Sequence, residues 1–194
     1  MKWFNPRRLL FVIASICLVF IFSGLVIIDS NRGDIDDSTA SILESSEKVI
    51  PIRIRIPNIG VNAPIISVGL TEQKTMESPE EPSDAAWFKL GPSPGDNGNS
   101  VITGHTGWRI GPALFDDLDK LKVGDKVYVE NEEGETLVFV VREMRVYGAN
   151  EIVPEVWNNK EDSAHLNLIT CSGAWNVSTG TFEKRLVVFT DLVT

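Results

Sequence analysis

The chain has few of the residues that build metal centres and disulfide frameworks. Its 194 residues include two cysteines, Cys17 and Cys171, and two histidines, His105 and His165. These four form no cluster with metal-ligand spacing, so we expect no structural metal site. Basic residues are also in the minority, 18 against 27 acidic ones, which argues against a nucleic-acid partner.

The longest apolar run lies near the N-terminus. Residues 9–28, "LLFVIASICLVFIFSGLVII", carry no charge and are numerous enough for one helix to cross the ~30 Å hydrocarbon core of a bilayer. Three basic residues precede the run and four aspartates follow it within 29–37. The asymmetry predicts a cytoplasmic N-terminus at 1–8, a transmembrane anchor at 9–28 and an extracellular remainder. A cleaved signal peptide is the alternative, but the run is longer than usual for one and no clear A-x-A site follows.

The part beyond the anchor divides by composition. Residues 29–48 are rich in Ser and Asp and poor in large apolar side chains, which predicts a flexible, solvated stalk. Residues 49–194 have the usual length of a single domain with its own core, and they show no internal repeat. All 27 acidic residues and all but three of the 18 basic ones follow the anchor, so the exterior carries a formal charge of 15 − 27 = −12.

Apolar residues recur at period two along most of 49–194, which is the pattern of strands with one buried face. Two segments favour helix instead: 113–121, "ALFDDLDKL", has leucines at helical spacing, and "VPEVWNN" at 153–159 predicts a short helical turn. The domain is therefore predicted to be mainly β, as a closed barrel or a sandwich. The predicted strands are 50–57, 62–68, 100–105, 126–131, 136–147, 165–171 and 185–192.

Cys171 ends the predicted strand 165–171 and is the single cysteine beyond the anchor. Because Cys17 lies inside the anchor, the two cannot bridge within one molecule. A free cysteine is most often a small buried apolar residue, and that interpretation stays open. An unpaired thiol outside the cell is also a candidate nucleophile, provided that a base or a cation favours the thiolate.

Two polar residues are candidate partners of this thiol, because both are predicted at the same edge of the sheet. His105 ends the strand 100–105, next to glycines that let the backbone turn. Arg185 opens the next strand after Cys171, and its guanidinium suits an oxyanion or a substrate carbonyl. His165 starts the strand that Cys171 ends, roughly 20 Å away along an extended chain, so we predict that it is an ordinary surface or strand-end residue.

Three motifs, taken in order, resemble the sortase signature: "TGH" at 103–105, "LITC" at 168–171 and the arginine that opens the last strand. Sortases are membrane-anchored cysteine transpeptidases of mainly Gram-positive bacteria. The similarity covers nearly all of 49–194, and "GPSPGDNG" and "GPALFDDLDKLKVGDKV" resemble class F sortases most closely. Two features depart from that class: Gly107 stands where an acidic residue is common, and "WRI" at 108–110 makes the following loop bulkier.

The resemblance implies an eight-stranded sortase-type closed β-barrel with short helices and a two-step acyl transfer. Cys171 matches the nucleophile, His105 the general acid/base, Arg185 the arginine that binds the oxyanion or the substrate, and Thr170 the substrate-side threonine before the cysteine. The implied partners are a protein with an LPXTG-like sorting signal, cleaved between Thr and Gly, and an amine acceptor of the cell wall or a pilin. No cofactor is implied.

Some sortases bind Ca²⁺ in acidic loops, and Glu77, Glu80 and Glu81 form an acidic loop here. Three loop carboxylates are more often a solvated face, so we predict no metal site. Two other functions stay open. An L,D-type transpeptidase would need an S-H-G-C-like run, which the chain lacks, and the other alternative is a non-enzymatic anchored adhesion or scaffold domain that keeps a sortase-like barrel.

Overall fold

The computed structural model describes residues 48–107, 111–158 and 162–193. The predicted cytoplasmic segment 1–8, the anchor 9–28 and the stalk up to residue 47 lie outside the described residues, as does "WRI" at 108–110. Within the described ranges, no helix combines the length and the apolar character that a membrane crossing requires.

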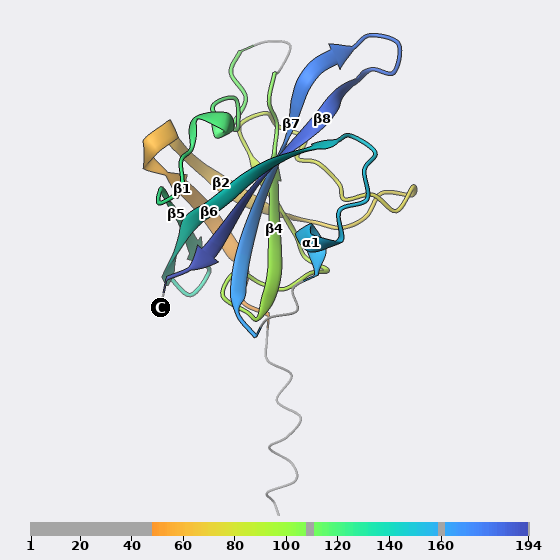
Figure 1. Ribbon diagram of the computed structural model, residues 1–194. Helices are drawn as coiled ribbons and strands as arrows, with labels where there is room; N and C mark the ends of the chain where they lie inside the picture. The colour runs from red at the N-terminus through yellow and green to blue at the C-terminus, as the bar shows by residue number, and fades with distance from the viewer. Residues whose placement is uncertain (1–47, 108–110, 159–161, 194) are drawn as a thin grey trace, which may run out of the picture. The chain divides into compact units, whose positions relative to one another are not determined.

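Eight strands of the described chain close into one barrel, in the order β1-β2-β3-β4-β7-β8-β6-β5 (Figure 1). This confirms the predicted mainly-β, eight-stranded closed barrel. Two neighbouring pairs, β2–β3 and β4–β7, are parallel, and each needs a long crossover connection. The strands are β1 (Pro51–Ile56), β2 (Val61–Val68), β3 (Ala85–Phe88), β4 (Gly98–Gly104), β5 (Lys126–Asn131), β6 (Thr136–Gly148), β7 (Ala164–Asn176) and β8 (Thr181–Leu192).

The helices are short. The predicted helical turn at 153–159 is confirmed as α1 (Pro154–Trp157), which begins at a proline, a residue well suited to the first helical position. The helix predicted over 113–121 is wrong, because the segment forms turns and one 3₁₀ turn, η3 (Leu118–Lys120). The Asp116 carboxylate accepts the Ala113 N–H (2.8 Å), and such side-chain bonds compete with helix formation. A further 3₁₀ turn, η2 (Pro57–Ile59), joins β1 to β2.

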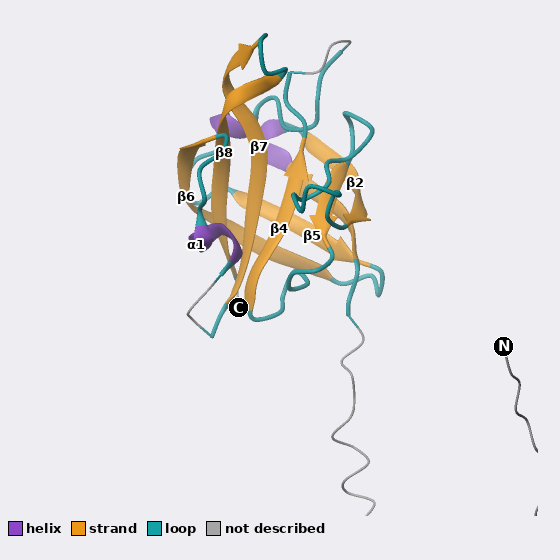
Figure 2. Cartoon of the chain, turned by 90° about the vertical axis from the view of Figure 1, so that its right-hand side faces the viewer, coloured by secondary structure: helices purple, strands orange, loops and turns teal. Residues whose placement is uncertain are grey.

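The wall formed by β4, β7, β8 and β6 carries apolar side chains on both faces. Successive residues of a strand point to opposite faces, so Leu166, Leu168 and Val188 enter the main core inside the barrel. Strand residues that point to the other face, Val101, Val187 and Phe189, are buried together with Val156 in a second cluster outside the barrel. Val156 belongs to α1, which therefore covers part of this outer face (Figure 2).

Beyond the barrel wall, β7 and β8 continue together as a two-stranded hairpin, drawn in blue at the upper right of Figure 1. The hairpin follows a β-bulge, where the register shifts between Ser172 and Trp175 and Gly173 adopts a φ of 79°. Trp175 packs edge-on against Phe182 with ring centroids 5.2 Å apart. Both strands are thus longer than predicted.

Candidate active site

The sequence predicted that Cys171 ends its strand. In the structure Cys171 lies within β7, because the strand continues to Asn176. The residue is partly exposed and its thiol forms no disulfide in the described chain. Cys171 has the same parity as Ile169, a residue that packs against the outer apolar cluster. The thiol therefore faces the outside of the barrel, next to the point where the hairpin leaves the wall.

Arg185 is the direct antiparallel partner of Cys171. This register confirms the predicted antiparallel return, although β8 begins earlier than predicted, at Thr181. The Arg185 guanidinium turns along its own strand. Its Nη1 donates to the carbonyls of Phe182 (3.1 Å) and Lys184 (2.9 Å), and its Nη2 donates to Thr181 Oγ1 (3.4 Å).

His105 lies on the other side of β7 from Arg185, directly after the end of β4. The parallel ladder between β4 and β7 pairs Thr103 with Ile169, and His105 and Cys171 each follow two residues later. The strand β4 ends at Gly104, one residue before His105, so extending this register by two residues brings His105 level with Cys171. We call His105, Cys171 and Arg185 the row: Cys171 and Arg185 are paired on β7 and β8, and His105 follows the end of the neighbouring strand β4.

Two threonine hydroxyls hold β4 and β7 together next to this row. Thr103 Oγ1 donates to the Ile169 carbonyl (3.0 Å), and Thr170 Oγ1 donates to the Gly104 carbonyl (2.8 Å). Thr170 is only 4 % exposed, and its hydroxyl is committed to the residue that precedes His105. Its contacts are those of a residue that keeps the cysteine and histidine strands in register.

The backbone after β4 is fixed by the segment that follows it. The Phe115 N–H donates to the His105 carbonyl (2.9 Å), and a Cβ at Gly104 would lie 2.6 Å from the Phe115 ring. Asp116, which the sequence analysis did not single out, accepts the Gly107 N–H (2.8 Å). These contacts require glycine at 104 and define the turn that leads away from His105.

The structure also accounts for Gly107, one of the two departures from class F. Its φ is 66°, a left-handed conformation that glycine adopts without strain. A Cβ at this position would lie 2.8 Å from the ring of Phe182 in the hairpin. An acidic side chain at 107 would therefore displace either the turn after His105 or the hairpin after Cys171.

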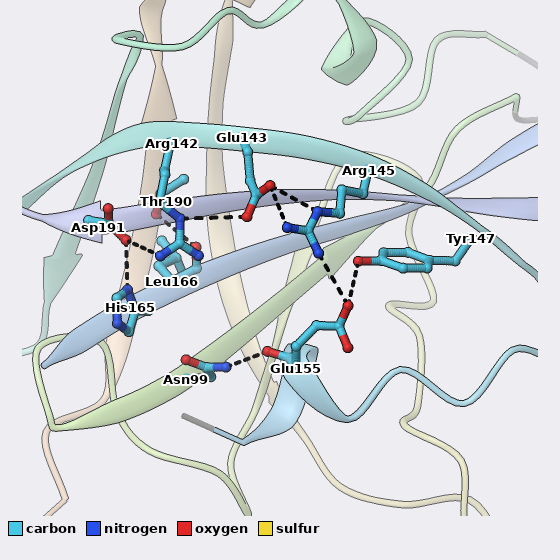
Figure 3. Close-up of polar contacts among 10 residues, drawn as sticks. All are labelled: Asn99, Arg142, Glu143, Arg145, Tyr147, Glu155, His165, Leu166, Thr190 and Asp191. Atoms are coloured by element: carbon cyan, nitrogen blue, oxygen red, sulfur yellow. Dashed lines mark hydrogen bonds and ion pairs between the residues drawn. The ribbon is translucent and has the colours of Figure 1, made fainter. Parts of the chain in front are cut away.

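His165 lies at the start of β7, as predicted for a strand-end residue, but it is not on the surface, because it is only 8 % exposed. Its Nδ1 lies 2.7 Å from Asp191 Oδ1, and Arg142 approaches the same carboxylate at 3.4 Å (Figure 3). Its Nε2 lies 2.8 Å from Ser163 Oγ. The cluster ties the start of β7 to the end of β8. It lies at the opposite end of the wall from Cys171 and does not join the row.

Polar contacts clamp α1 against the outer face of the wall (Figure 3). Asn99 Nδ2 donates to the Glu155 carbonyl and Asn167 Nδ2 to the Val156 carbonyl, both at 2.7 Å. The Glu155 carboxylate accepts the Tyr147 hydroxyl at 3.0 Å, and burial raises the pKa of this phenol, so it stays protonated as a donor. The helix thus covers the part of the outer face that carries Asn99 and Asn167.

The acidic loop considered for Ca²⁺ makes internal contacts. Glu77 Oε2 accepts the Gly69 N–H at 2.7 Å. In the part of the chain that the structure describes, no group of three or more His, Cys, Asp or Glu side chains is placed to hold a metal ion.

Comparison with known proteins identifies the family. The model of the sortase domain matches residues 54–193. Sortase A of Bacillus anthracis is 32% identical over 170 residues, which are 86% of this chain and 71% of that protein. Sortase C2 of pilus island 1 from group B Streptococcus is 28% identical with a TM-score of 0.56, covering 74% of this chain and 73% of that one. Sortase C1 from Streptococcus agalactiae is 26% identical with a TM-score of 0.57, covering 74% and 67%.

The structure is a closed barrel in which a cysteine and an arginine are paired on neighbouring strands and a histidine follows the end of the strand next to them. With the match over most of its length, the chain belongs to the sortase family, whose members are cysteine transpeptidases.

Proposed function

We propose that this chain is a membrane-anchored sortase of class F that cleaves an LPXTG-like sorting signal between Thr and Gly. The protein would then be transferred to an amine of the cell wall or of a pilin. The observation that supports the proposal is the pairing of Cys171 with Arg185 on β7 and β8, with His105 directly after the end of the neighbouring strand β4. Ile169, two residues before Cys171, is partly exposed and offers an apolar contact for the residues of the signal.

In the first step the Cys171 thiolate attacks the carbonyl carbon of the signal's threonine. A C–S bond forms and the carbonyl oxygen becomes an oxyanion, which Arg185 stabilises. The C–N bond then breaks as His105 protonates the leaving glycine amine, and a thioester remains on Cys171. This is nucleophilic catalysis with general acid assistance and electrostatic stabilisation of the oxyanion.

In the second step the acceptor amine attacks the thioester carbonyl. His105 accepts the proton that the amine loses, a new amide bond forms, and Cys171 departs as a thiolate. Thr170 would contribute by holding Gly104, and with it His105, in register with Cys171. Positioning of this kind matters because a small misplacement of a reacting group can cost about 10²-fold in rate.

Arg185→Lys is expected to lower kcat/KM by about 10²–10³, the usual cost of losing an oxyanion donor. The substitution keeps the charge, but a point-like ammonium cannot reproduce the planar fork or its contacts with the hairpin carbonyls. Steady-state peptide cleavage measures the effect. Lys184→Ala is the matched control, because it removes an exposed cation from the adjacent position, and it should stay close to wild type. Near-normal activity of Arg185→Lys would exclude the proposed role.

The proposed activity predicts cleavage of LPXTG-like peptides by the full chain in detergent. A library that varies each position of the signal, read by mass spectrometry, should give products cut between Thr and Gly. Peptides with the same composition in scrambled order should stay intact. If no library member is cut under conditions where the protein is folded, the alternative of a non-enzymatic scaffold with a sortase-like barrel is favoured.

We also propose that residues 9–28 anchor the chain with residues 1–8 in the cytoplasm and the barrel outside. The proposal rests on the charges that flank the apolar run. Protease added to intact protoplasts should then remove the barrel while cytoplasmic marker proteins survive. Protection of the barrel until the cells are lysed would show the opposite orientation.

A further inference from the structure

The imidazole of His105 makes a contact that the sequence did not predict. Its Nε2 lies 2.7 Å from the backbone carbonyl oxygen of Pro79, 26 residues earlier in the chain. A carbonyl oxygen only accepts hydrogen bonds, so the nitrogen that faces it must carry the proton. In a neutral imidazole the other nitrogen, Nδ1, is then the basic one.

We propose that the Pro79 carbonyl is the positioning group of His105: it fixes the ring and its tautomer, so that Nδ1 is the nitrogen that gains and loses the catalytic proton. The inference rests on the proposed role of His105 as general acid/base. A nucleophile and its base are commonly completed by a third group that orients the base, and a backbone carbonyl can do this as well as a carboxylate.

The segment that presents Pro79 is the crossover between the parallel strands β2 and β3, residues 69–84, which we call the Pro79 loop. Its base is closed by three contacts. The Glu77 N–H donates to the Gly69 carbonyl (3.1 Å), the Glu77 carboxylate accepts the Gly69 N–H (2.7 Å), and Leu70 and Met76 form a β-bridge. The first part of the loop, residues 69–77, is therefore closed on itself, and Pro79 follows two residues after its end.

Two further features hold the carbonyl itself. Pro79 is buried although Ser78 and Glu80 on either side are exposed, so its ring is the anchored part of this stretch and fixes the local φ. Three residues later, the Pro82 carbonyl accepts the Leu114 N–H (2.8 Å), next to Phe115, which bonds the backbone of His105. The loop and the turn after His105 are thus joined by a backbone hydrogen bond close to the imidazole contact.

A positioning contact of this kind acts on the proton transfers and leaves substrate binding nearly unchanged. If the loop loosens, the ring can turn and place either nitrogen toward the sulfur, and only one of these orientations is productive. We expect a loss of about ten- to a hundredfold in kcat, with KM close to wild type. Glu77 is the side chain that tests this, because its carboxylate closes the loop without contacting the row.

The first measurement is the tautomer itself, in the full chain in detergent micelles. The chain contains two histidines, so ring-¹⁵N-labelled histidine gives two imidazole signal sets, and His165→Gln assigns them. With His105 neutral, we expect its Nε2 to be protonated and its Nδ1 to be unprotonated. The opposite tautomer in the wild-type protein would overturn the inference whether or not any variant folds.

The second measurement compares Glu77→Ala, Glu77→Gln and Glu72→Ala. Glu77→Ala removes the acceptor of the Gly69 N–H and should lower kcat about tenfold or more while the His105 tautomers become mixed. Glu77→Gln keeps an amide oxygen in its place and should rescue both readouts. Glu72→Ala removes an exposed carboxylate of the same loop and should resemble wild type.

The outcomes are distinguishable. A wild-type kcat and a single tautomer in Glu77→Ala would overturn the positioning role, and so would a Glu77→Gln protein as impaired as Glu77→Ala, since that would point to charge. If the chain cleaves no sorting peptide, the proposed function fails, but the tautomer and its response to Glu77→Ala still decide whether Pro79 orients His105.

Discussion

Replacement of Cys171 by alanine is expected to abolish both peptide cleavage and transfer, with a loss of at least about 10⁴ in kcat. Both proposed steps pass through a covalent bond to the sulfur, and Thr170 and Ser172, its neighbours along β7, carry no group of comparable nucleophilicity. Cys171 is partly exposed and lies outside the main core, so the variant should fold. Cleavage assays together with a thermal melt measure both expectations.

The matched measurement is peptide binding. Because alanine leaves Arg185 and the outer apolar cluster in place, the Cys171→Ala protein should bind the sorting peptide with an affinity close to that of wild type. Retained binding with lost turnover separates a missing nucleophile from a damaged surface. Substantial cleavage by Cys171→Ala would mean that another residue is the nucleophile.

His105→Ala is expected to lower kcat by about 10²–10⁴, the usual range for removing a general acid/base. An unprotonated amine is a poor leaving group. Water is a poor substitute for the imidazole as proton donor in a site that the substrate occupies. Loss of acid assistance should therefore affect the acylation step most, and single-turnover cleavage measures that step directly.

His165→Gln is the control for this substitution. It changes the other imidazole of the chain, at the far end of β7, where the contacts with Asp191 and Ser163 are structural. We expect a lower melting temperature and near-normal turnover below it. Near-normal activity in His105→Ala, or an inactive but folded His165→Gln, would contradict the assignment of roles.

Strands β1, β2, β5 and β6 could be predicted because one face of each lies in the barrel, which imposes period two on the sequence. Strands β4, β7 and β8 are buried on both faces and were found as longer apolar runs between turn residues. Strand β3 was missed because it has four residues, of which Ala85, Ala86 and Trp87 are all buried, and such a short run without alternation carries little signal. The ends of β7 and β8 were missed for the opposite reason. The hairpin that they form lies outside the barrel, so burial does not impose alternation on it.

Cys171 and His105 were singled out because cysteine and histidine are scarce in the chain, and Arg185 because it opens the last predicted strand; their catalytic roles stay predictions. Their side-by-side arrangement depends on the strand order β4-β7-β8, which no local pattern encodes. The residues that support them leave weaker signals. The Asp116 carboxylate accepts backbone N–H groups of residues that are close in the sequence. An aspartate shortly after the histidine motif could therefore have predicted a side-chain bond to this turn. Pro79 contacts His105 through its backbone carbonyl, which every residue has, so the residue type at position 79 does not predict the contact.

The most direct measurement is the mass of the acyl-enzyme. The full chain in detergent is mixed with an LPXTG-like peptide without acceptor amine, quenched in acid within a single turnover, digested and mapped by mass spectrometry. We expect the acyl part of the peptide, ending at its threonine, on the fragment that contains Cys171, and we expect hydroxylamine to release it as a thioester should. Cleavage of the peptide with no adduct at Cys171, or with the adduct on another residue, would contradict the proposed mechanism.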